Sequence, residues 1–225
     1  MKAEAKSRRA RGDGGTEYSP TLYKVGHAVM GAFFRLYFRF RIENRHFIPP
    51  QGPVLLVANH VSALDHIALG LAVNRRATFV GRTAIFQIPI AGYFFRKWGG
   101  IAIHRDETDA VAVRRILEAL RAGLVVGMFP EATRSYTGKL QEIRPGAVKL
   151  AIKGRAQVLP TAVLGLFEAM PRTSKFPRPK PVTIRFGEPF DYSELYGQQL
   201  TGADLAAAAD LMRDRMLRVL NQTGA

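Results

Sequence analysis

A histidine and an aspartate near residue 60 have the spacing of a general base and its supporting carboxylate. His60 and Asp65 lie in the segment NHVSALDH, directly after the apolar residues 54–58. A carboxylate at this distance can hold one ring nitrogen of the imidazole and stabilise the ring once it has taken a proton. We interpret the pair as a base that activates a substrate hydroxyl, because it has no nucleophilic partner of its own. The alternative is that Asp65 only caps a helix and His60 is a polar turn residue.

A second polar group has the chemistry of a phosphate site. The segment FPEATRS, after the apolar residues 124–129, supplies a carboxylate, two hydroxyls and a guanidinium, from Glu131, Thr133, Ser135 and Arg134. Arg105 follows the apolar residues 100–104 in the same way. Arginine suits phosphate, and a carboxylate can hold a hydroxyl of a polyol. We therefore expect a phosphate site beside the base, with a solvated turn at 129–135 as the alternative.

The helix expected after His60 predicts further details of the site. Ser62 has the properties of an N-cap, and Asp65 stands three residues later, so a helix should begin here with its carboxylate turned back toward the cap. The backbone amides that follow His60 would then be available to stabilise an oxyanion. His66 lies inside this helix, and we expect it at the surface or in the outer shell of the site rather than as the base.

The absence of cysteine and the spacing of the histidines exclude other chemistries. With no cysteine in the chain, disulfides, thiolate metal sites and a cysteine nucleophile are ruled out. The five histidines have no metal-ligand spacing, so we expect no metal.

Apolar stretches alternate with helical patterns along most of the chain. The predicted strands are residues 54–58, 78–81, 100–104, 124–129, 158–164 and 182–186. The predicted helices are residues 62–74, 85–97, 107–122, 145–153 and 202–221, the last with Thr201 and Asp204 in capping-box spacing. This alternation is typical of an α/β fold in which helices flank a mostly parallel central sheet. We expect a single domain over residues 42–225.

The N-terminal part of the chain and the net charge indicate a membrane surface. The chain has 33 Lys and Arg against 18 Asp and Glu, a net charge of +15, which implies a polyanionic partner. Residues 1–20 read as a flexible basic arm, and residues 21–41 as an apolar, aromatic and basic helix lying in a membrane interface. A first helix that packs on the core is the alternative. No apolar run is long enough for a spanning helix, and we expect an unexported protein.

A basic, proline-rich stretch could make a second membrane contact. Residues 172–180 contain Arg172, Lys175, Arg178 and Lys180 among prolines. A solvated loop is the alternative interpretation. We find no recognition helix or aromatic-basic module that would favour nucleic acid as the partner.

Four segments together resemble a known family. NHVSALDH, WGGIAIHR, FPEATRS and VLPTAV are similar, in this order, to the four motifs of the glycerol-phosphate and lysophosphatidate acyltransferases, the PlsC-like superfamily. The resemblance runs from about Pro53 to Pro189. The third motif normally has glycine where this chain has Ala132, which bears on the shape of the acceptor pocket if that position needs a left-handed backbone.

The resemblance implies roles for individual residues. His60 would be the base and Asp65 its orienting partner, while Arg105, Glu131 and Arg134, with Thr133 and Ser135, would bind a phosphate-bearing acceptor. Asn59, Pro130 and Pro160 would shape the pocket. No cofactor is implied beyond acyl-CoA or acyl-carrier protein as co-substrate.

The implied reaction moves a fatty acyl group from a thioester to 1-acylglycerol-3-phosphate, giving phosphatidate for phospholipid biosynthesis. The expected partners are a lipid acceptor and an anionic membrane surface, with the enzyme peripheral or monotopic on the cytoplasmic face. Alternatives are a different acceptor (a glycolipid, a lyso-ornithine lipid or glycerol-3-phosphate) or a catalytically silent membrane-binding relative.

Overall fold

The computed structural model describes residues 20–87, 92, 95–96, 99–103 and 109–222. Most of the predicted arm at 1–20 and the predicted phosphate ligand Arg105 therefore lie outside the described residues. The end of the predicted strand 100–104 and much of the predicted helix 85–97 also lie outside the described residues. Helix α4 (Thr83–Gln87) overlaps the start of that predicted helix.

One mostly parallel sheet forms the centre of the described part of the chain. Its strands are β1 (Arg41–Glu43), β2 (Val54–Ala58), β3 (Ala77–Arg82), β4 (Ile101–Ile103), β5 (Val125–Met128), β6 (Gln157–Leu164) and β7 (Thr183–Phe186). The order across the sheet is β1-β7-β6-β2-β5-β3-β4. Neighbouring strands are parallel except for the antiparallel pair β6–β7. The predicted α/β class with a mostly parallel sheet is confirmed.

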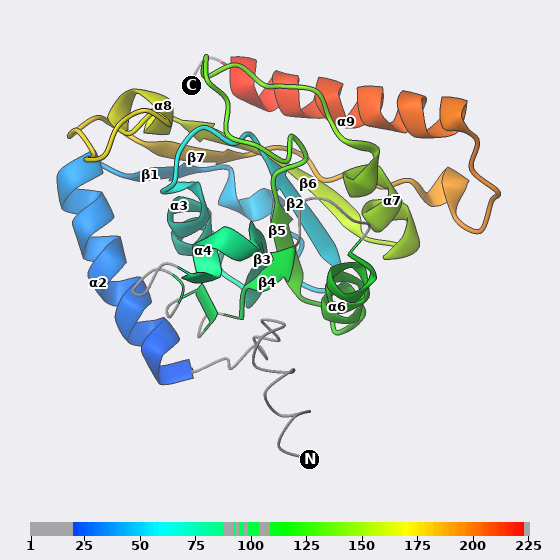
Figure 1. The fold of residues 1–225 in the computed structure, drawn as a ribbon, viewed down its shortest axis with the longest axis horizontal. Helices are drawn as coiled ribbons and strands as arrows, with labels where there is room; N and C mark the ends of the chain where they lie inside the picture. Colours follow the sequence, from blue (N-terminus) through cyan, green and yellow to red (C-terminus); the bar gives the residue numbers. More distant parts are fainter. Residues whose placement is uncertain (1–19, 88–91, 93–94, 97–98, 104–108, 223–225) are drawn as a thin grey trace.

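Helices cover both faces of this sheet, as Figure 1 shows. They are α2 (Pro20–Phe38), α3 (Asp65–Ala72), α6 (Ala110–Arg121), α7 (Pro145–Lys153), α8 (Leu166–Ala169) and α9 (Gly202–Asn221). Alternate residues of β2 belong to different cores: Leu56 lies in the core with α2 and α3, and Leu55 lies in the core with α6, α7 and α9. Burial on both faces explains why this strand is apolar throughout.

The first helix divides its apolar residues between the core and the surface. Phe34 and Phe38 are fully buried in the core shared with α3. Val29 and Leu36 are 62% and 84% exposed on the same helix. Core packing, the alternative interpretation, therefore applies to one side of this helix, and the expected place in a membrane interface stays a prediction. No helix in the described ranges is long and apolar enough to cross a membrane.

Several predicted boundaries differ from those of the structure. The helix predicted over residues 21–41 ends at Phe38, because Arg39 takes a left-handed backbone with φ of 48°. Arg41 instead begins β1, a short strand that the sequence analysis missed. Helices α7 and α9 have the predicted bounds, and α9 has the predicted capping box between Thr201 and Asp204.

The strand directions explain why distant segments meet. Because β2, β3, β5 and β6 run parallel, their carboxyl ends lie at the same edge of the sheet. The segments after these strands contain His60, Phe129–Ser135 and, beyond α8, Arg172, while Arg82 is the last residue of β3. Ligands of open α/β sheets bind at this edge.

Candidate active site

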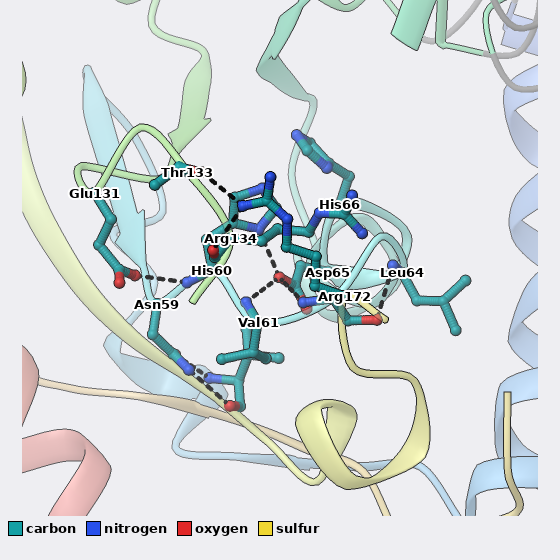
Figure 2. A network of polar contacts seen from close by, with 12 residues as sticks. Asn59, His60, Val61, Leu64, Asp65, His66, Glu131, Thr133, Arg134 and Arg172 are labelled. Atoms are coloured by element: carbon teal, nitrogen blue, oxygen red, sulfur yellow. Dashed lines mark hydrogen bonds and ion pairs between the residues drawn. The ribbon is translucent and has the colours of Figure 1, made fainter. Parts of the chain in front are cut away.

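The predicted base and its carboxylate are in contact. His60 Nδ1 lies 2.7 Å from Asp65 Oδ2, and Figure 2 shows the two side chains together. The same oxygen accepts hydrogen bonds from the backbone amides of Val61 and Ser62, at 2.7 and 2.8 Å. Because Nδ1 donates its proton to Asp65, Nε2 of the neutral ring is left as the basic atom. The Asp65 side chain is fully buried, and the His60 side chain is 15% exposed.

The loop before α3 reaches this geometry in a different way from the one predicted. The N-cap of α3 is Leu64, and Asp65 is the first helical residue, so the prediction of Ser62 as N-cap is wrong. Ser62 Oγ instead donates to Met170 O at 2.8 Å. Asp65 still turns back into the loop, as expected. The amides of Val61 and Ser62 donate to Asp65, however, so the predicted use of the amides after His60 for an oxyanion does not apply to these two groups.

Burial keeps the imidazole uncharged. The pKa of His60 is lowered, first by burial and then by the positive charges of Arg134, Arg82 and Arg172. Burial also raises the pKa of Asp65, while the amides of Ser62 and Val61 act in the opposite direction. A neutral His60 can accept a proton at neutral pH. The imidazolium so formed would pair with the carboxylate instead of being a lone buried charge.

Aromatic rings fix the plane of the imidazole. Phe129 stacks on His60 with ring centroids 3.9 Å apart and planes 9° apart. His66 packs edge-on against Phe129 at 4.7 Å, and its Nε2 donates to Val80 O. His66 is therefore buried behind the site. Of the two positions expected for His66, the outer shell of the site is confirmed and the surface is excluded.

Glu131 lies beside the base but uses both oxygens within the protein. Oε1 accepts from the backbone amide of His60 at 2.7 Å. Oε2 accepts from the backbone and side-chain nitrogens of Gln141, at 2.8 and 3.1 Å. The carboxylate is 2% exposed. This geometry favours a role in positioning His60, whereas the sequence predicted that Glu131 binds the acceptor.

The other predicted residues of the FPEATRS segment have different environments. Thr133 Oγ1 accepts from Arg172 Nη1 at 3.2 Å, at the half-buried rim where Arg134 also lies. Ser135 is fully buried, and its amide donates to His60 O at 2.7 Å. Pro130 O accepts from Arg144 N at 2.9 Å. The structure thus brings all of these residues near the base, but the Ser135 side chain faces the protein interior.

Two further predicted residues connect the site to the sheet. Asn59 Nδ2 donates to Val163 O at 3.0 Å, and Asn59 Oδ1 accepts from Val163 N at 2.7 Å. This pair of bonds fixes the loop that precedes His60 onto β6. Pro160 lies inside β6 opposite Val57 of β2. Both residues therefore have structural positions, and their expected effect on the shape of the pocket stays a prediction.

Two arginines near His60 were missed by the sequence analysis. Arg82, the last residue of β3, donates to Ala132 O. Arg172 reaches the same loop from the segment after α8. Arg82 could have been found, because it directly follows the predicted strand at 78–81, and Arg105 was selected for the same position after the predicted strand at 100–104. Arg172 gave no such signal, because it stands eight residues beyond β6 in a basic stretch that we assigned to the membrane or to a solvated loop.

The alanine that replaces the usual glycine does take a left-handed backbone. Ala132 has φ of 58°. For an alanine this conformation costs about 1–2 kcal/mol. Ala132 O accepts from Arg82 Nη2, and Ala132 N donates to Phe129 O, so neighbouring hydrogen bonds hold the residue in this conformation.

The described residues offer no group of three or more histidine, aspartate and glutamate side chains that could hold a metal ion. The polar groups that surround His60 are the Asp65 and Glu131 carboxylates and the guanidinium groups of the nearby arginines.

Residues 39–164 match the Acyltransferase family. The chain belongs to this family. The matched residues include His60, Asp65 and the whole FPEATRS segment. The predicted resemblance to the PlsC-like acyltransferases is confirmed.

Several similar proteins are named 1-acyl-sn-glycerol-3-phosphate acyltransferase. The chloroplastic 1-acyl-sn-glycerol-3-phosphate acyltransferase of Arabidopsis thaliana is 32% identical over 142 residues, which cover 62% of this chain and 40% of that protein. The alpha form of the mouse enzyme of the same name is 26% identical over 188 residues, covering 82% of this chain and 64% of that protein. The chain thus spans less than two thirds of the length of these relatives.

A solved structure has the same fold. The 1-acyl-sn-glycerophosphate acyltransferase PlsC from Thermotoga maritima superposes with a TM-score of 0.71 over 91% of this chain and 80% of that chain, at 22% sequence identity. At this identity the likeness concerns the fold.

The Glu131→Gln variant tests whether Glu131 positions the base. A glutamine must turn its amide group toward either the His60 amide or the Gln141 donors, so one of these contacts becomes repulsive. We expect kcat to fall about 10–100-fold, as for a small misplacement of a catalytic group, with the acceptor KM unchanged. Glu142→Gln, an exposed neighbour, is the matched control. A raised acceptor KM with a preserved kcat would instead assign Glu131 to acceptor binding.

The pH dependence of kcat/KM tests the state of His60. A histidine that acts as a base must be neutral to accept a proton, so a His60 pKa below 6.5 would extend activity toward acid. The groups that set this pKa are Arg82, Arg134 and Arg172, with Asp65 and His66 in contact with the ring. We expect half-maximal kcat/KM below pH 6.5, with full recovery of activity on return to neutral pH. An acidic midpoint at or above pH 6.5 would show that burial does not suppress protonation.

Proposed function

We propose that the protein transfers a fatty acyl group from an acyl thioester to the free hydroxyl of 1-acylglycerol-3-phosphate and so forms phosphatidate. The observation that carries this proposal is the His60–Asp65 contact at 2.7 Å with arginines around the ring. The names of the relatives and the family membership support the same reaction.

The geometry suggests the following course for the reaction. His60 Nε2 accepts the proton of the acceptor hydroxyl as its oxygen attacks the thioester carbonyl carbon. The tetrahedral intermediate then collapses, the C–S bond breaks, and the imidazolium returns the proton to the leaving thiolate. General-base assistance of this kind contributes about 10²–10⁴-fold to the rate. Asp65 stabilises the imidazolium between the two proton transfers.

The remaining acceleration requires that two substrates be held in register. An acyl thioester and a lipid acceptor must meet with the reacting atoms about 3–3.5 Å apart. A phosphate held by arginine side chains would fix the acceptor relative to His60. This makes the arginines part of the catalytic apparatus, since they align the hydroxyl as well as bind the lipid.

The arginines also favour one class of acceptor. A glycolipid or lyso-ornithine lipid has no phosphate, and three guanidinium groups around the base would then have no anionic partner from the substrate. A phosphorylated acceptor fits them better. Glycerol-3-phosphate remains the alternative with the same headgroup. The acyl donor would be acyl-CoA or acyl-carrier protein, with no further cofactor.

We place the protein at a membrane surface because its acceptor is a lipid. Val25, Val29, Phe33 and Leu36 follow one another at helical spacing on α2, and all are exposed. Phe176 is 79% exposed on the loop after α8, and Tyr37 Oη donates to Pro177 O at 2.9 Å, which joins this loop to α2. Exposed Lys24, Arg35, Lys175 and Arg178 accompany these apolar side chains. The surface would sit peripherally on anionic lipids at the cytoplasmic face.

Acyl transfer from acyl-CoA to lysophosphatidate tests the proposed reaction. Thiol release and phosphatidate formation are measured for the wild type and for His60→Ala. We expect acceptor-dependent turnover that falls at least about 10²-fold in the variant, because the general base is lost. Turnover that survives the substitution would contradict the role of His60. If the wild type uses glycerol-3-phosphate in preference, the alternative acceptor replaces the proposed one.

Vesicle sedimentation tests the membrane surface. In Val29→Ser/Leu36→Ser two exposed apolar side chains are replaced without disturbing the buried Phe34 and Phe38. We expect binding to vesicles with anionic lipid to weaken about tenfold or more, since each large apolar side chain contributes about 1.5–3 kcal/mol when buried. Val111→Ser, an equally exposed valine on α6, is the control and should bind normally. Equal binding by all three proteins would exclude α2 as the contact.

A further inference from the structure

Three guanidinium groups approach the base from three different segments. Arg82 comes from the end of β3, Arg134 from the segment after β5, and Arg172 from the segment after α8. Each of the three positive charges disfavours protonation of His60, which places them within electrostatic reach of its ring. Only Arg134 among them lies in the FPEATRS motif, from which acceptor binding was predicted.

Hydrogen bonds join Arg172 and the residues before it to the FPEATRS and NHVSALDH segments. Its Nη1 donates to Thr133 Oγ1 at 3.2 Å and to Arg134 O at 3.3 Å. Two residues earlier, Met170 O accepts from Ser62 Oγ at 2.8 Å, which ties the segment to the loop that carries His60. Figure 2 shows the side chain reaching across to Thr133 and Arg134. Arg172 therefore belongs structurally to the active site and not to the exposed basic loop that follows it.

The guanidinium group of Arg172 contacts an aromatic ring and uses only one of its nitrogens for hydrogen bonds to described residues. It stacks over the Tyr136 ring with its central carbon 4.3 Å from the ring centroid. Among the described residues, only Nη1 makes a hydrogen bond to protein, and both acceptors of that bond are neutral. Both oxygens of the Glu131 carboxylate bond to His60 and Gln141, and Asp65 Oδ2 bonds to His60, while Asp65 Oδ1 is buried and has no hydrogen-bond partner among the described residues. A half-buried guanidinium without an anionic partner among these residues suits a phosphate ligand.

We propose that Arg172 binds the phosphate group of the acceptor, together with Arg134. This inference rests on the proposed function, because it assumes a phosphate-bearing acceptor. Arg172 would take one edge of the phosphate from the side of α8, while Arg134 takes another from the segment after β5. The guanidinium group lies over the Tyr136 ring, and the hydrogen bond from Ser62 to Met170 ties the segment of Arg172 to the loop of His60.

Kinetics in detergent micelles separate this role from membrane binding. Wild type, Arg172→Met, Arg172→Lys and the control Arg121→Met are compared at saturating acyl-CoA, with lysophosphatidate or monoacylglycerol as acceptor. Arg121 is an exposed residue at the end of α6 and loses the same charge. We expect Arg172→Met to raise the KM for lysophosphatidate about 10–100-fold, the value of one charge-assisted hydrogen bond. Its donor KM should change less than threefold, and its kcat should fall by a smaller factor than the acceptor KM rises.

The monoacylglycerol arm identifies what Arg172 recognises. The KM for this acceptor should not change in Arg172→Met, so the preference for the phosphorylated lipid should fall by the same 10–100-fold. Arg172→Lys should regain part of the affinity, because it keeps the charge but loses the paired donors. A fall in kcat on both acceptors with unchanged KM would mean that Arg172 only braces the Thr133–Arg134 loop, and would overturn the proposal.

Calorimetric titration with inorganic phosphate tests the site without turnover. We expect the wild type and Arg121→Met to bind phosphate and Arg172→Met to bind at least tenfold more weakly. If the wild type acylates neither lipid but this dependence on Arg172 holds, the proposed reaction fails and the phosphate role of Arg172 stands. Phosphate binding that is absent in the wild type, or equal in Arg172→Met, would overturn the role of Arg172 whatever the turnover.

Discussion

One carboxylate oxygen organises the site of this protein. Asp65 Oδ2 accepts hydrogen bonds from the His60 ring and from the amides of Val61 and Ser62, all within 2.8 Å. The ring bond selects the tautomer that leaves Nε2 basic, and the amide bonds fold the loop so that the ring can reach the carboxylate. Because α3 begins at Asp65, the helix and the strand β2 together set the position of the base. Loss of this single interaction would release both the ring and the loop.

The surroundings of this oxygen decide what the pair can do. Burial and three arginines keep His60 neutral, and Phe129 and Glu131 fix the plane of its ring and the place of its backbone. The same positive charges that lower the pKa of the base are suited to an anionic acceptor. In the proposed reaction, affinity for the phosphate and the neutral state of the base would therefore come from one set of side chains. The carboxylates of the site bond to groups of the protein itself.

The sequence predicted the parts of the site that depend on local spacing. The contact of His60 with Asp65 follows from five residues of chain, and the helices at 145–153 and 202–221 follow from apolar periodicity and capping residues. The sequence did not predict the features of the fold and the site that depend on tertiary packing. Strand β1 has three residues and exists because it pairs with β7. The N-cap of α3 is Leu64 and not Ser62, whose hydroxyl donates to Met170, over a hundred residues away. Arg172 enters the site through the same long-range contact, which no local pattern in the sequence reveals.

The most direct test of this account is acyl transfer by Asp65→Asn under single-turnover conditions, with the fold checked by thermal unfolding. An asparagine keeps the shape of the side chain and can still accept these hydrogen bonds with its one oxygen, but it has no negative charge to stabilise the protonated His60 ring. The account predicts a folded protein whose transfer rate falls about 10³–10⁴-fold, as when an aspartate that orients a catalytic histidine becomes asparagine. A folded variant that transfers within tenfold of the wild-type rate would show that the Asp65 carboxylate does not control the base.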